Sequence, residues 1–268
     1  MAALAFAAAA PQARATLYFA DDFSTFTPGN LVGQNSWTQL GASATLPLQV
    51  SGGYVTIPGG QTVDNQDAAK AFATQASPIS STVYVGMSLR IDSAPNSGVS
   101  YFMALMESSG NFANARLAAI NNTSLAGTYF LEARYTGQGG NPFVPGVIPL
   151  NYGTTYNVIL EAIITPTGAG EGINVYVDPT SNDISMETPY LSAPASTGFI
   201  IPPVGFYQVI ISQFASGTVF NDGLGIDHVN VASTFGEAAQ VVPEPSSFLL
   251  AGLAGLGLVA VWRRTRRR

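Results

Sequence analysis

The sequence predicts an all-β protein whose main domain is a β-sandwich. Charged residues make up only 10% of the 268 residues while glycine occurs 28 times, a composition that favours strands and tight turns over solvated helices. Several runs alternate apolar and polar residues, the period of a half-buried strand. Hydrophobic residues, at 47%, suffice for a buried core.

The clearest strand runs from Ser81 to Asp92, where one face is apolar and the other is mostly polar. Turn residues bound similar runs elsewhere, and no long amphipathic helix interrupts them. The absence of a repeat period argues against a solenoid or a propeller. The other expected strands are Tyr101–Glu107, Thr128–Tyr135, Thr155–Ile164, Ile173–Val177, Val204–Phe214 and Leu224–Val231.

The N-terminal segment, residues 1–15, has the features of a secretory signal. An apolar stretch from Ala2 to Ala10 precedes Ala13-Arg14-Ala15, which fits the small-x-small cleavage rule. We therefore expect export and a mature chain that begins at Thr16. The departure from the pattern is the lack of a basic residue before the apolar stretch.

The C-terminal segment predicts a transmembrane helix. Residues 246–262 carry no charge over 17 positions, which as a helix reaches about 25 Å, near the lower limit for a bilayer. Five arginines follow, so the end of the chain, residues 263–268, is expected in the cytoplasm. A buried core helix is the alternative, but it would need no arginine cluster. The arginines are Arg263, Arg264, Arg266, Arg267 and Arg268.

A linker, residues 237–245, joins the sandwich to this helix and ends in Val242-Pro243-Glu244-Pro245. The order of signal, domain, Pro-Glu-Pro, apolar span and arginines resembles the PEP-CTERM sorting-signal proteins of Gram-negative, exopolysaccharide-producing bacteria. The resemblance implies processing by an exosortase after export by the secretion machinery. The precursor would sit in the inner membrane through its C-terminal helix, and the mature form would be at the cell surface or extracellular.

The segment from residue 16 to residue 236 resembles concanavalin-like or laminin-G-like jelly rolls. The stretches that carry this likeness are FADDFSTFTPGNLVGQNSWTQ, GMSLRID, GINVYVDP and GLGIDHVNVASTF. The predicted fold class is therefore a jelly-roll, concanavalin-like β-sandwich with an N-terminal signal segment and a C-terminal transmembrane helix.

The charge and the cysteine count exclude several functions. Residues 16–236 hold four basic residues and fourteen acidic ones, which argues against nucleic-acid binding. The chain has no cysteine, so it has neither disulfides nor thiolate metal sites.

The residues predict no enzymatic activity. Concanavalin-type glycosidases place their carboxylates along one strand as Glu-x-Asp-x-x-Glu, and the sequence lacks that run. The nearest substitutes, Glu132 and Glu161, are interpreted as solvent-facing charges on different strands, with a paired acid and base as the alternative. His228 is the only histidine, and we expect it to pack rather than to act as a base.

Two binding hypotheses remain, and no cofactor is required. Asp21, Asp22, Asn221, Asp222 and Asp227 are candidate oxygen ligands for one structural Ca²⁺, with strand capping and a turn as the alternative. Trp37 is the leading candidate for stacking on a glycan, with burial in the core as the alternative.

The function we expect is that of an exported, exosortase-processed surface or matrix protein. It would be structural or weakly carbohydrate-binding and associated with exopolysaccharide or biofilm. The alternatives are a divergent glycan-active hydrolase or lyase, and a structural filler with no specific ligand.

Overall fold

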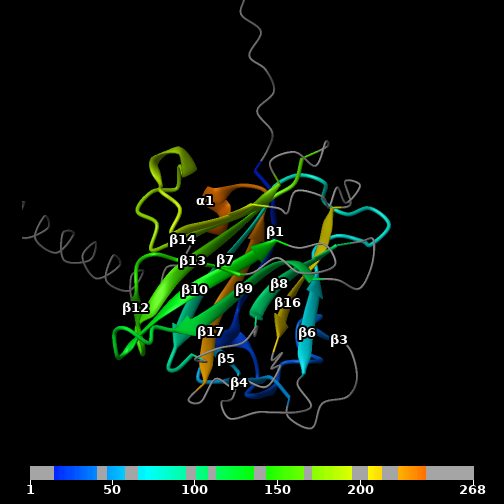
Figure 1. Ribbon diagram of the computed structural model, residues 1–268. Helices are drawn as coiled ribbons and strands as arrows, with labels where there is room; N and C mark the ends of the chain where they lie inside the picture. Colours follow the sequence, from blue (N-terminus) through cyan, green and yellow to red (C-terminus); the bar gives the residue numbers. More distant parts are fainter. Residues whose placement is uncertain are drawn as a thin grey trace, which may run out of the picture.

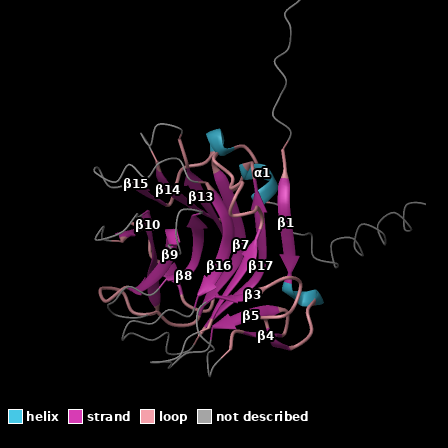
Figure 2. Ribbon diagram, turned by 90° about the vertical axis from the view of Figure 1, so that its right-hand side faces the viewer, coloured by secondary structure: helices cyan, strands magenta, loops and turns pink. Residues whose placement is uncertain are grey.

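The protein folds as a sandwich of two antiparallel β-sheets, shown from two sides in Figures 1 and 2. The predicted jelly-roll-like β-sandwich is thereby confirmed. The computed structural model describes residues 15–40, 47–57, 66–94, 101–107, 113–135, 143–165, 171–194, 205–212 and 223–239.

The larger sheet has nine strands among the described residues, and β1 pairs with β17 beside the main path. The first and last strands of the described sandwich therefore lie next to each other. In spatial order the strands are β15 (Leu191–Pro194), β14 (Gly172–Val177), β13 (Thr155–Ile163), β7 (Val83–Ile91), β17 (Leu224–Ala232), β5 (Tyr54–Ile57), β4 (Gln49–Ser51) and β2 (Gly29–Asn30), with β1 (Leu17–Asp22).

The smaller sheet has eight strands in the described part of the chain, and its short strand β12 pairs with β10. In spatial order these strands are β11 (Val144–Pro145), β10 (Thr128–Tyr135), β9 (Ala113–Asn121), β8 (Tyr101–Glu107), β16 (Phe206–Ser212), β6 (Asp67–Ala71) and β3 (Thr38–Leu40), with β12 (Leu150–Asn151). Two short 3₁₀ helices, η1 (Phe23–Thr25) and η2 (Ile184–Met186), lie between strands.

The main core lies between the two sheets and follows from the alternation in the sequence. In β7 the residues Val83, Val85, Met87, Leu89 and Ile91 are each at most 1% exposed. Each such side chain contributes on the order of 1.5–3 kcal/mol by leaving water. The predicted inward face of this strand is confirmed.

The outer face of the larger sheet is partly covered by the only α-helix of the described residues, α1 (Phe235–Ala238). Figures 1 and 2 both place α1 near β7 at one end of the sandwich. Gly86 of β7 makes this close approach feasible, because a Cβ there would collide with the backbone carbonyl of Ala238. The face of β7 that the sequence predicts to be exposed is therefore buried at Gly86, and Ser88 on the same face is buried as well.

The predicted terminal segments fall outside the described residues. These are residues 1–14 of the signal, the end of the linker with Val242, Pro243, Glu244 and Pro245, the helix at 246–262 and the arginines after it. Within the described ranges, no helix combines the length and the apolar character needed to cross a membrane. The described fold runs three residues past the predicted domain limit at 236, to Ala239.

Candidate functional site

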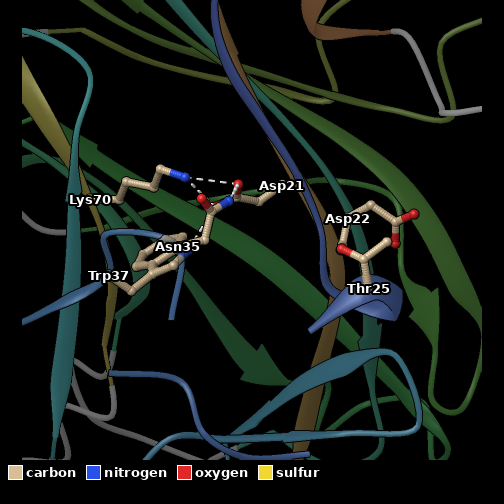
Figure 3. A network of polar contacts seen from close by, with 6 residues as sticks. All are labelled: Asp21, Asp22, Thr25, Asn35, Trp37 and Lys70. Carbon is tan, nitrogen blue, oxygen red and sulfur yellow. Dashed lines mark hydrogen bonds and ion pairs between the residues drawn. The ribbon is translucent and has the colours of Figure 1, made fainter. Parts of the chain in front are cut away.

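A buried ion pair joins the two sheets through Asp21 and Lys70, as Figure 3 shows. Asp21 lies on β1 of the larger sheet and Lys70 on β6 of the smaller sheet. The Lys70 ammonium lies 2.8 Å from both carboxylate oxygens of Asp21. The Asp21 and Lys70 side chains are 1% and 10% exposed, so the pair is shielded from solvent.

Trp37 and Asn35 complete this cluster by donating to the same carboxylate. The Trp37 indole N–H donates to Oδ2 of Asp21 at 2.7 Å, and the Asn35 amide donates to Oδ1 at 2.7 Å. Lys70 also lies 4.6 Å from the centre of the Phe19 ring. The negative charge of Asp21 is thus met by one cation and two neutral donors, as a buried carboxylate requires.

The prediction that Trp37 stacks on a glycan is wrong, and its alternative, burial in the core, is confirmed. Trp37 is 1% exposed and packs against Phe23 and Phe19, with ring centres 6.1 and 6.5 Å away. Its indole N–H donates to the buried Asp21 carboxylate, and at 1% exposure neither ring face is open to a ligand.

The five candidate calcium ligands do not converge among the described residues. The Asp21 carboxylate is bound by Lys70, Trp37 and Asn35. Figure 3 shows Asp22 turned away from this cluster, towards Thr25. Asp22 caps η1, since its carboxylate accepts the backbone N–H of Ser24 at 2.9 Å. Asp227 is half-buried on β17, whereas Asn221 and Asp222 lie outside the described residues. No group of three or more acidic, histidine or cysteine side chains forms a metal site in the described part, so calcium stays a prediction.

Glu161 is buried, so the prediction of a solvent-facing charge is wrong at this position. It lies on the outer face of the larger sheet, in the region where α1 packs against β13. Its carboxylate accepts the hydroxyls of Tyr84 and Tyr176, both at 3.0 Å, and the Asn174 amide at 2.8 Å. Burial and the nearby Glu161 charge raise the pKa of both tyrosines, which therefore remain donors.

Glu132 is also buried rather than solvent-facing, but on the opposite side of the molecule. Its β10 neighbours Leu131 and Ala133 face the main core, so Glu132 lies on the outer face of the smaller sheet. Desolvation raises the pKa of its carboxyl. Glu132 and Glu161 thus lie on outer faces of different sheets, with the core between them, and they do not form a carboxylate pair.

His228, the single histidine, is 6% exposed on β17. Its burial lowers the pKa of the imidazole, while nearby Asp22 opposes that shift. The expectation of a packed histidine is confirmed.

A pocket on the outer face of the larger sheet is the candidate binding site. Thr56, Gly225 and Arg90 lie side by side in one row across β5, β17 and β7. Gly225 has no side chain, so the row is hollow at its centre. The Tyr54 ring lies beside this hollow. A Cβ added at Gly225 would be 3.5 Å from that ring. Asp92 completes the wall by accepting from Nε of Arg90 at 2.8 Å.

The lining of this pocket matches the chemistry of a sugar. The Tyr54 ring offers an apolar face, and the Arg90–Asp92 pair offers donors and acceptors side by side at half-exposed positions. Ser51 and Thr56 add hydroxyl groups. The sequence predicts a mostly polar outward face for the strand that holds Arg90 and Asp92, but it does not predict this pocket. Only the strand register brings Tyr54 and Gly225 to them.

Comparison with known families concerns the C-terminal end of the chain. A family model described as the PEP-CTERM protein-sorting motif matches residues 241–267. The chain carries a PEP-CTERM motif. The predicted recognition is confirmed, and the motif implies an exported protein that an exosortase processes.

The sandwich has distant structural neighbours. The CBM2 module of the evolved Dit of Lactobacillus casei BL23 phage J-1 has a TM-score of 0.44 at 9% identity, over 82% of this chain and 96% of that one. The cellulose-induced protein Cip1 has a TM-score of 0.44 at 14% identity, over 81% and 97%. An endo-β-1,4-glucuronan lyase from Trichoderma reesei has a TM-score of 0.43 at 14% identity, over 83% and 98%. No curated protein matches the sequence.

Proposed function

We propose that this protein is a non-enzymatic component of the cell surface or extracellular matrix, which holds weakly to exopolysaccharide after exosortase processing. The observation that carries the proposal is the PEP-CTERM motif at 241–267, placed directly after a folded β-sandwich. In this account the precursor stays in the inner membrane through residues 246–262, and the sandwich is delivered to the outside.

The separation of Glu132 and Glu161 supports the absence of enzymatic activity. Glycoside hydrolysis by the usual mechanism needs two carboxyl groups about 5–10 Å apart on either side of one bond. Here the two best candidates face away from each other on different sheets. Glu161 is moreover held by three donors, which favours a packing role.

The sorting motif gives the first test of the proposal. Replacing Pro243, Glu244 and Pro245 by alanine should abolish processing, because the helix would then extend into a cleavage site that the prolines keep extended. We expect the full-length form to accumulate in the inner membrane of an exosortase-containing host, measured by immunoblotting of membrane and external fractions. The control is Val147→Ala, at a position of the sandwich that is 82% exposed. Normal processing of the alanine-replaced motif would contradict the proposal.

The Tyr54 pocket gives the second test, which also separates binding from catalysis. Tyr54→Ala should weaken retention of the processed protein on neutral polysaccharides such as xylan or dextran by about tenfold, through loss of the stacking face. Gly225→Ala should act in the same direction, since it partly fills the hollow while the added carbon meets Tyr54 at an ordinary contact distance. The control is Tyr207→Ala, which removes a half-buried tyrosine from the other sheet.

The remaining outcomes of this assay distinguish the alternatives. Release of reducing sugar ends that Glu132→Gln or Glu161→Gln abolishes would indicate a divergent hydrolase or lyase. Equal weak retention of all variants and the parent would favour a structural filler with no specific ligand.

A further inference from the structure

The helix α1 lies where the described sandwich ends and the sorting segment begins. It spans Phe235–Ala238, and the matched sorting motif starts at residue 241. Thr234 and Glu237 fit the Ser/Thr-x-x-Glu pattern of a helix start, and the Thr234 hydroxyl accepts the backbone N–H of Glu237 at 3.4 Å. A single turn is too short to be stable alone, so α1 depends on its contacts with the sheet.

Phe235 anchors α1 on the outer face of the larger sheet. Its side chain is 3% exposed and packs edge to face with two tyrosines. The ring centre of Phe235 lies 6.1 Å from that of Tyr84 on β7 and 5.0 Å from that of Tyr176 on β14. Gly86 makes room for the end of the turn, because a Cβ there would collide with the Ala238 carbonyl. We call Tyr84, Gly86 and Tyr176 the docking site of α1.

The start of the described sandwich lies beside the same helix. The backbone N–H of Ser233 donates to the Thr16 carbonyl at 2.8 Å, and the Thr16 N–H donates to the Ser233 hydroxyl at 2.8 Å. Figure 2 shows α1 next to the start of β1. Because Thr16 is the expected first residue of the mature chain, the signal segment and the sorting segment leave the sandwich at one end. In the proposed precursor, that end faces the membrane.

The chain between α1 and the expected cleavage site is short. Only residues 240–242 separate Ala239, the last described residue, from Pro243. Three extended residues reach at most about 11 Å. A folded sandwich at that distance leaves little room for an enzyme that must hold an extended peptide on both sides of the bond. Release of residues 235–239 would add about 17 Å of extended chain.

We propose that α1 is a latch on processing: the exosortase cleaves this chain only while α1 is released from its docking site. One turn at the end of a domain opens locally far more often than the whole domain unfolds, so release needs no unfolding of the sandwich. Phe235 and Gly86 are then positioning residues, since they set the reach of the sorting motif without touching the cleaved bond. The inference rests on the proposed function and adds a step that controls it.

The test follows processing of the full-length protein in an exosortase-containing host, by pulse–chase labelling and immunoblotting. Phe235→Ala removes the anchor of α1. Gly86→Ala adds one methyl group on the outer face, while the core-facing neighbours Val85 and Met87 stay unchanged. Each variant should shorten the lifetime of the precursor about tenfold, which corresponds to about 1.4 kcal/mol of docking free energy.

An insertion separates the reach of the chain from the stability of the sandwich. Six residues of a Gly-Ser repeat placed after Ala239 add about 20 Å of extended chain and alter no residue of the sandwich. This variant should be processed as fast as Phe235→Ala although α1 stays docked. Adding Gly86→Ala to it should then have no further effect, whereas a merely structural role of α1 would make the two changes additive.

Gly205→Ala is the matched control. It places the same methyl group against another backbone carbonyl, that of Ile79, just before β16 in the smaller sheet. This change should destabilise the sandwich, measured as a lower midpoint of thermal unfolding, and should leave the processing rate at that of the parent.

Three results would overturn the proposal: processing of Phe235→Ala and Gly86→Ala at or below the parent's rate, an equal acceleration in Gly205→Ala, or an insertion that leaves the rate unchanged. The proposed function fails in a different way, because the parent itself would then remain unprocessed. Retention of neutral glycan reads out that function separately in Phe235→Ala, since Gly225 of the Tyr54 pocket and the α1 contacts lie at opposite ends of β17.

Discussion

Asp21→Asn is expected to lower the free energy of unfolding by about 3–5 kcal/mol, the usual cost of removing one partner of a buried ion pair. The substitution keeps the shape of the side chain and an oxygen that can accept from Trp37, so it removes little except charge. What it leaves is the Lys70 ammonium, 10% exposed and without its counter-charge. A loss of this size is a large part of the stability of a typical domain.

Two variants test this explanation in urea unfolding of the processed protein. The double variant Asp21→Asn/Lys70→Met should regain most of the loss, since the stranded charge is gone and the methionine packs in the same space. Asp92→Asn removes the carboxylate of the exposed Arg90–Asp92 pair and should cost no more than about 1 kcal/mol. If Asp21→Asn costs as little as Asp92→Asn, the inter-sheet ion pair is not a stabilising element.

Lys70 also provides a chemical probe of the same pair, because it is the only lysine of the sequence. An amine-reactive reagent should modify the native processed protein at its N-terminus and leave Lys70 unmodified. In Asp21→Asn the Lys70 amine should react measurably faster, as local opening becomes easier.

Trp37→Ala is expected to destabilise the sandwich by about 3–5 kcal/mol, as large-to-small changes of buried aromatic residues do. The side chain is 1% exposed and packs on Phe23, so its removal leaves a cavity beside the Asp21 carboxylate. Trp37→Phe should cost less, because it keeps most of the ring and loses only the N–H that Asp21 accepts. Thermal unfolding followed by circular dichroism measures both.

The measurement also decides between a structural and a binding role for Trp37. A Trp37→Ala variant that unfolds at the parent's midpoint but no longer binds glycan would contradict the burial seen here. Retention of neutral glycan by Trp37→Phe, at temperatures where it is folded, would support Tyr54 as the stacking residue instead.

Much of the sandwich could be predicted from the sequence because alternation is a local property. β8 and β10 have the predicted limits. β13, β14 and β17 differ by one residue at one end, and β7 is shorter by two residues at its start and one at its end. β9 was missed. It is rich in alanine, which has a low β-propensity, and only its place between β8 and β10 makes Ala113–Asn121 a strand.

The candidate sites were harder to predict because they depend on pairs that are distant in sequence. Asp21 and Lys70 are separated by 49 positions, and the sequence gives no sign that they meet between the sheets. Glu161 was expected in solvent because nothing local indicates that a single-turn helix near the end of the domain, α1, packs against its strand. The row of Thr56, Gly225 and Arg90 likewise requires the register of three strands.

In the proposed function, the sandwich is delivered outside the cell and separated from its C-terminal tail. The most direct measurement is the intact mass of the protein recovered from the outer surface or medium of an exosortase-containing host. We expect a chain that ends near Pro243–Pro245, with the mass of residues 246–268 missing, and a full-length form confined to the inner membrane. A full-length chain, arginines included, dissolved in the cytoplasm would contradict it.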